Sequence, residues 1–168
     1  MATFKLISTI TVGSGGTAGI DFTSIPQGYK DLKVLLSGRS EQNVYSFRIT
    51  FNNNTSNYST RVLIGDGSTA VSDNNGDTTF LRAYAMNPST YSANVFNNAE
   101  IYIPNYSGSL AKTAQILAVT ENNATESYMV IGAGRWNDTA AITSLKIFQS
   151  GADIAEFSSA SLYGIRNS

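Results

Sequence analysis

The chain of 168 residues carries 11 basic and 12 acidic side chains, a formal charge of -1, and its charged fraction of 14% lies well below the roughly 25% usual in soluble domains. This balance excludes the basic field that nucleic-acid binding requires. The count of zero His and zero Cys excludes His- or Cys-based catalysis, zinc sites and disulfides. A hydrophobic fraction of 42% suffices for one core, so residues 1–168 are expected to form a single domain. No apolar stretch approaches the about 20 residues of a membrane-spanning helix, so no membrane contact is expected.

Period-two alternation of apolar and polar residues dominates the chain and predicts strands along its length. β-branched and aromatic residues are enriched in the alternating segments. No segment combines a helix cap with the i, i+3, i+4, i+7 spacing of an amphipathic helix. In chain order, the predicted strands are Phe4 to Val12, Leu32 to Ser37, Val44 to Phe51, Thr60 to Ile64, Phe80 to Met86, Ala99 to Ile103, Thr113 to Thr120, Ser127 to Ala133, Ile142 to Phe148 and Phe157 to Ile165.

Two of these segments indicate which side chains should lie inside the fold. Each places four apolar side chains on one side, as a half-buried antiparallel strand requires. The expected core residues are Phe4, Leu6, Ile10 and Val12 in the first segment, and Tyr45, Phe47, Ile49 and Phe51 in the third.

The connectors have the chemistry of tight turns. Clusters of Gly, Asn and Asp at 13–16, 65–68, 73–77 and 121–125 tolerate positive φ or bond their own backbone. Many short strands joined by such turns predict an all-β fold, namely a single antiparallel β-sandwich with jelly-roll or Greek-key connections. A closed β-barrel is the alternative.

Three features resemble functional motifs but lack residues that the chemistry needs. The glycine-rich run 13–19 has an alanine in place of the third glycine of a dinucleotide fingerprint. The turn 73–77 alternates oxygen side chains like a calcium loop, but Thr78 occupies the position of the required glycine. Acid–base catalysis needs carboxyl groups in buried surroundings, whereas Glu121 and Glu126 bracket a polar turn. We therefore expect no catalytic residue, no cofactor and no metal.

The single tryptophan, Trp136, has two interpretations. On an exposed surface its ring would stack on a sugar, while Arg135 and Asn137 bond hydroxyl groups. In the core it would close one end of the sandwich, with its indole N–H bonded to a backbone carbonyl, and this second interpretation is favoured. Abundant tyrosine in a weakly charged chain also suits an interface that buries aromatic surface. The candidate interface or glycan contacts are Arg135, Trp136, Asn137, Tyr84, Tyr91, Tyr102 and Tyr106.

Several segments, in order along nearly the whole chain, carry a family resemblance. They read IDFTSIPQGYKDL at 20–32, LLSGRS at 35–40, FN at 51–52, NYS at 57–59, IYIPNY at 101–106, AITSL at 141–145 and SLYGI at 161–165. Together they resemble a family of small virion structural proteins of tailed bacteriophages, well represented among cyanophages and other marine phages.

The resemblance implies a structural role and brings no catalytic residues with it. We expect a capsid decoration (cement) protein that binds the outer surface of the major capsid lattice and stabilises it, so the major capsid protein is the expected partner. The alternative is a tail-fibre or spike head that binds host surface glycans. Both roles imply a homotrimer, whose closed ring matches a threefold position. The chain would be made in the bacterial host cytoplasm and located on the capsid exterior of the virion.

Overall fold

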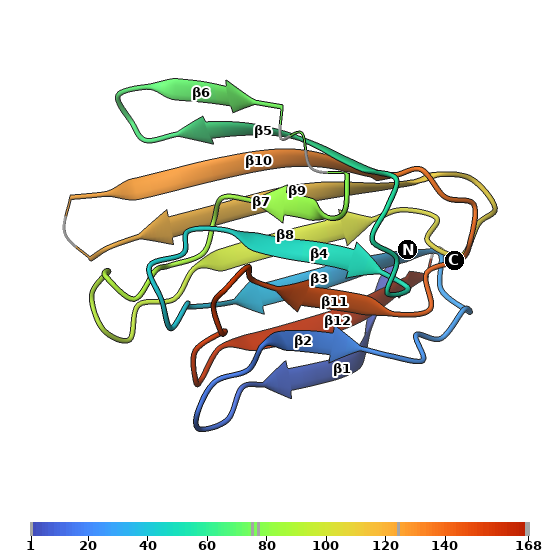
Figure 1. Cartoon of the computed structure of the whole chain (residues 1–168). Helices are drawn as coiled ribbons and strands as arrows, with labels where there is room; N and C mark the ends of the chain where they lie inside the picture. Colours follow the sequence, from blue (N-terminus) through green and yellow to red (C-terminus); the bar gives the residue numbers. More distant parts are fainter. Residues whose placement is uncertain (1, 75, 77, 124, 167–168) are drawn as a thin grey trace.

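The computed structural model describes residues 2–74, 76, 78–123 and 125–166, which form two antiparallel sheets packed face to face (Figure 1). The larger sheet has eight strands in the order β1-β12-β3-β8-β9-β10-β5-β6, and the smaller sheet has four in the order β2-β11-β4-β7. The strands are β1 Thr3–Thr11, β2 Gly19–Phe22, β3 Asp31–Ser37, β4 Phe47–Phe51, β5 Tyr58–Gly65, β6 Ala70–Asp73, β7 Leu81–Ala83, β8 Asn98–Ile103, β9 Lys112–Glu121, β10 Ser127–Trp136, β11 Leu145–Phe148 and β12 Ser159–Arg166.

The chain alternates between the two sheets in the manner of a jelly roll. Strands β1, β3, β8 and β12 lie side by side in the larger sheet, and β2, β4, β7 and β11 make up the smaller one. The other four strands, β9, β10, β5 and β6, extend the larger sheet beyond β8, and β5 and β6 form the upper edge of the view in Figure 1. The predicted antiparallel β-sandwich is confirmed, and the open edges at β1 and β6 distinguish it from a closed barrel.

The core lies between the sheets because the strands bury alternate side chains. In β9, Ala114, Ile116 and Ala118 are buried while the residues between them are exposed. Small residues let the sheets approach closely at the next strand. Gly134 of β10 faces Leu81 of β7, and a Cβ added to this glycine would lie 2.8 Å from the Cδ1 atom of Leu81. This contact joins the four-stranded extension to the last strand of the smaller sheet.

The expectation that Phe4, Leu6, Ile10 and Val12 share one buried side is wrong. The pairing of β1 with β12 shifts between Leu6 and Ser8, as it does where a β-bulge inserts an extra residue. Side chains before the bulge therefore point to the opposite side from those after it. Phe4 and Leu6 are exposed, whereas Val12 is buried.

The third predicted strand is correct except at its start. Phe47, Ile49 and Phe51 are buried as expected. Tyr45 is exposed because β4 begins only at Phe47, so the alternation of the sheet does not reach it. The short strands β2 and β6 were not predicted, and β7 and β11 cover only part of the segments predicted for them.

Replacing Gly134 by alanine (Gly134→Ala) is expected to lower the free energy of unfolding by about 1–3 kcal/mol, because the added methyl group overlaps the fully buried Leu81 side chain. Gly65→Ala is the matched control at the end of β5, where an added Cβ meets nothing within 4 Å. Urea unfolding of the control should stay within about 0.5 kcal/mol of the natural protein. Equal stability of all three proteins would contradict the close contact between the sheets.

Candidate functional site

The outer face of the larger sheet exposes a group of large aliphatic side chains on the four-stranded extension. Each of these residues keeps between 42% and 51% of its surface exposed. They come from β5, β9 and β10, three adjacent strands. We call them the apolar patch: Leu63, Leu117, Val119, Met129 and Ile131.

The pairing of the strands makes the apolar patch continuous. Ile131 pairs with Leu117 on one side and with Leu63 on the other, and Met129 pairs with Val119. Side chains of directly paired residues have Cβ atoms about 4.5–5.5 Å apart, so these five lie in contact range of their neighbours. Single exposed aliphatic residues are common on proteins, but contiguous groups of them mark sites of interaction with other molecules.

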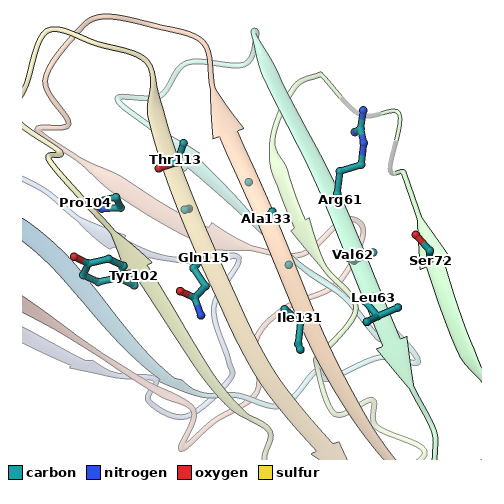
Figure 2. A pocket seen from close by; sticks show the side chains of 13 residues that line it. Arg61, Val62, Leu63, Ser72, Tyr102, Pro104, Thr113, Gln115, Ile131 and Ala133 are labelled. Atoms are coloured by element: carbon teal, nitrogen blue, oxygen red, sulfur yellow. The ribbon is translucent and has the colours of Figure 1, made fainter.

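A hollow of about 610 Å³ lies beside the apolar patch on the same face (Figure 2). The centre of the hollow is formed by the short side chain of Ala133 on β10. Ala133 pairs with Gln115 of β9 on one side and with Arg61 of β5 on the other. A small side chain between two long ones leaves a depression in the sheet surface. The residues around it include Arg61, Leu63, Ser72, Tyr102, Pro104, Thr113, Gln115 and Ile131.

Charge is distributed unevenly along the strands of this face. Arg61 lies beside the hollow, and Arg135 follows Ala133 on β10 at the same end of the strands. Glu121 lies at the opposite end of β9, paired with Ser127 of β10. The outer face is therefore basic at one end, apolar in the middle and acidic at the other end.

Three of the residues predicted from the sequence as contacts reach the surface on this side of the molecule. Arg135 is exposed on the outer face, and its Nη2 donates a hydrogen bond to Oδ1 of the exposed Asn137 at 2.7 Å. Tyr102 is half-buried beside the hollow, and its hydroxyl donates to Oδ2 of Asp31 at 2.8 Å. Burial, with the nearby Asp31 carboxylate, raises the pKa of Tyr102, so this hydroxyl remains a donor.

Two of the candidate contacts lie in the core and offer no surface to a partner. Trp136 is 1% exposed, stacks on Tyr58 with ring centroids 6.0 Å apart and packs against Phe51 at 5.7 Å. The interpretation of Trp136 as the closure of one end of the core agrees with this packing. Its indole N–H, however, has no hydrogen-bond acceptor among the described residues, so the expected backbone partner is absent. Tyr106 is fully buried, and its hydroxyl donates to the carbonyl of Pro26.

The remaining two tyrosines lie away from the apolar patch. Tyr84 is half-buried in a smaller hollow of about 140 Å³ that Tyr45 also lines. Its hydroxyl accepts a hydrogen bond from Nη1 of Arg82 at 3.0 Å. Tyr91 is buried and packs edge-on against Tyr45. The predicted contacts thus do not form one site, and the aliphatic patch was missed by a prediction that looked for aromatic residues.

A buried lysine lies inside the sandwich at the basic end of the outer face. Lys112, the first residue of β9, is 2% exposed, and its Nζ donates to the carbonyl of Leu110 at 2.6 Å. Burial lowers the pKa of Lys112, and the Asp138 carboxylate opposes part of this effect. A cation that has lost most of its water is stable only while such partners remain in place.

No protein-family model, curated protein or solved structure matches this chain. Within residues 2–74, 76, 78–123 and 125–166, there is no group of three or more acidic, His or Cys side chains that could hold a metal ion. The same part of the chain contains no helix long and apolar enough to cross a membrane. Of the turn at 73–77, Asn75 and Asp77 lie outside the described residues, as does Ala124 of the turn at 121–125.

The low pKa of Lys112 predicts a pH-dependent stability difference between the natural protein and the variant Lys112→Met. Between the lowered pKa of Lys112 in the folded state and its ordinary value of 10.5, the unfolded chain holds a proton that the folded chain has lost. The free energy of unfolding of the natural protein therefore rises, relative to that of the variant, as the pH increases toward 10.5, by about 1.4 kcal/mol for each unit of pKa difference. Tyrosine ionisation is common to both proteins and cancels. Urea unfolding at several pH values measures this difference, and a difference that does not change with pH would contradict the assignment.

Proposed function

We propose that this chain is a non-enzymatic structural protein of a bacteriophage virion, most specifically a capsid decoration protein that binds the outside of the major capsid lattice and stabilises it. The proposal joins the family resemblance of segments 20–32, 101–106 and 161–165 to the properties of the fold. An antiparallel sandwich with a continuous buried core is a self-contained module of the kind that such a structural role requires.

The single observation that carries the proposal is the apolar patch. Five aliphatic side chains remain about half exposed on three adjacent strands. Burial of apolar surface is favourable by about 25 cal/mol for each square ångström, and this free energy is not gained while the patch is exposed to water. A module whose role is to assemble into a larger structure recovers this free energy when another subunit of that structure covers the face. The weak charge of the chain supports the same role, because uncharged surface can be buried without leaving ions unpaired.

The alternative is a tail-fibre or spike head that binds host surface glycans. One observation favours it: the hollow places the polar side chains of Gln115, Thr113 and Arg61 around a depression large enough for a sugar ring. Two others weigh against it. The tryptophan that would stack on a sugar is buried, and Tyr102, which lines the hollow, is half-buried with its hydroxyl bonded to Asp31.

The copy number of the chain in purified particles separates the two roles. A decoration protein occupies a repeated lattice site, so its amount should be of the same order as that of the major capsid protein. Gel densitometry of intact virions, with the major capsid band as internal standard, measures this ratio. A ratio corresponding to only a few copies for each particle would contradict the decoration role and support the fibre head. Particles from which the chain has been removed should also disrupt at lower temperature, and they should regain stability when the purified chain is added back.

A further inference from the structure

We propose that the outer face of the larger sheet binds a second copy of this chain, face to face, about a twofold axis that lies between the two facing sheets and runs parallel to the row of Leu117 and Ile131, across the strands. The inference goes beyond the capsid-binding role and does not depend on it. It rests on three properties of this one face, namely its shape, its charge and its size. Each property is self-complementary under the same rotation.

The shape of the face pairs a projection with a hollow. Val119 and Met129 are paired with one another and project from the sheet. They lie two residues from Leu117 and Ile131, toward the end of the strands that carries Glu121. Gln115 and Ala133 surround the centre of the hollow. They lie two residues from Leu117 and Ile131 in the other direction, toward the end of the strands that carries Arg135. A twofold rotation about the axis parallel to this row leaves β9 facing β9 of the second copy and β10 facing β10, with the directions of the strands reversed. It therefore sets Met129 opposite Ala133 of the second copy and Val119 opposite Gln115 of the second copy.

The charges of the face follow the same symmetry. Arg135 lies four residues after Ile131 on β10, and Glu121 lies four residues after Leu117 on β9. Because the two strands are antiparallel, these charges lie at opposite ends of the face. The rotation that fills the hollow sets Arg135 of each copy opposite Ser127 of the other, and Glu121 is paired with Ser127 on β9, so the two charged side chains lie one strand apart across the interface. Two equivalent ion pairs would then flank an apolar centre, which is the arrangement of a polar rim around a hydrophobic interface core.

The charge on β3 and β8 does not disturb this pattern. Lys33 and Glu100, which lie on the outer face next to the extension, form an ion pair at 2.7 Å within one chain. Their charges are therefore already balanced before a second copy approaches. The unbalanced charge of the central strands is the arginine end and the glutamate end described above.

The size of the face is adequate for a stable pair. The two central strands β9 and β10 have ten residues each, which corresponds to a length of about 33 Å. Six strands from β3 to β6 span about 29 Å across the sheet. The strands on either side are shorter, with 7 and 6 residues in β3 and β8 and 8 and 4 in β5 and β6, so the face covers about 700 Å², close to the about 800 Å² that each partner buries in an interface of standard size. Sheets of two molecules packed in this way lie about 10 Å apart, as the two sheets of one sandwich do.

A twofold pair differs from the threefold ring that the family resemblance implies. In a ring, one patch of each copy meets a different patch of the next copy, whereas in a twofold pair the same patch meets itself. The hollow and the projection, like the arginine and the glutamate, lie on one face and match one another, so this face favours the pair. If the chain also decorates a capsid, such a pair would present two equivalent remaining surfaces and could bridge two lattice sites.

The test is the mass of the purified full chain in solution, measured by sedimentation equilibrium over a dilution series. The expected result is a dimer of twice the 18.0 kDa chain mass at high concentration. Ile131→Glu should weaken dimerisation at least about a hundredfold, because it places a charge at the centre of the interface. Leu110→Glu is the matched control, since Leu110 is a more exposed leucine in the loop before β9, and it should dimerise like the natural protein.

Exchange of the charged residues makes the test specific to the proposed geometry. Arg135→Glu and Glu121→Arg should each weaken dimerisation at least about tenfold, because each sets like charges near one another across the interface. The variant that carries both changes should recover most of the lost affinity. Circular dichroism and thermal unfolding of each variant verify that the monomer is folded, since Glu121 accepts a hydrogen bond from the Asn123 N–H at 2.6 Å and Arg135 donates one to Asn137.

The outcomes separate clearly. A chain that stays monomeric at every concentration, a trimer, or a dimer that Ile131→Glu leaves intact would overturn the proposal. A double variant as weak as its two parents would overturn the twofold geometry. None of these outcomes bears on the copy number in virions, so the decoration role and the dimer are tested separately.

Discussion

The packing of Leu81 against Gly134 is the contact on which the larger part of this structure depends. The jelly roll alone would be two layers of four strands, in which each layer covers the other. Four further strands extend one layer, and the opposite layer ends at β7. The side chain of Leu81 enters a notch that only a glycine provides, and this brings β7 close enough to cover the inner face of β10. Without that approach, the inner face of the extension would be exposed in addition to its outer face.

Much of the fold could be predicted from the sequence, and the exceptions have physical causes. The alternation in β3, β9 and β10 placed these strands correctly, because long strands in the middle of a sheet have one face that must be buried. The same periodicity failed in β1, since a bulge reverses the sides of the strand and a bulge leaves no mark in the apolar pattern. Strands β2 and β6 have four residues each, too few for an alternation to be distinguished from a turn.

The candidate site was harder to predict than the fold. Aromatic residues were chosen as contacts because aromatic surface is common at interfaces, yet Trp136 and Tyr106 are needed in the core. The signal of the apolar patch was present in the run Ile116 to Val119, where apolar residues occupy both sides of a strand. Such a pattern is typical of strands that are covered on both faces, whereas Leu117 and Val119 on the outer face of β9 remain exposed within this chain. The sequence could not say that the second cover lies outside the chain, because this depends on which strands the smaller sheet reaches.

The two edges of the larger sheet have a consequence for how such a chain behaves when it is made in quantity. An open edge presents unpaired backbone N–H and C=O groups, to which another strand can add without limit. Here one edge strand, β1, is broken by a bulge, and the other, β6, is only four residues long and carries Ser72 and Asp73. Both are poor templates for a further strand. Growth of fibres by addition of strands to these two edges is therefore disfavoured, so the folded protein tolerates high concentration.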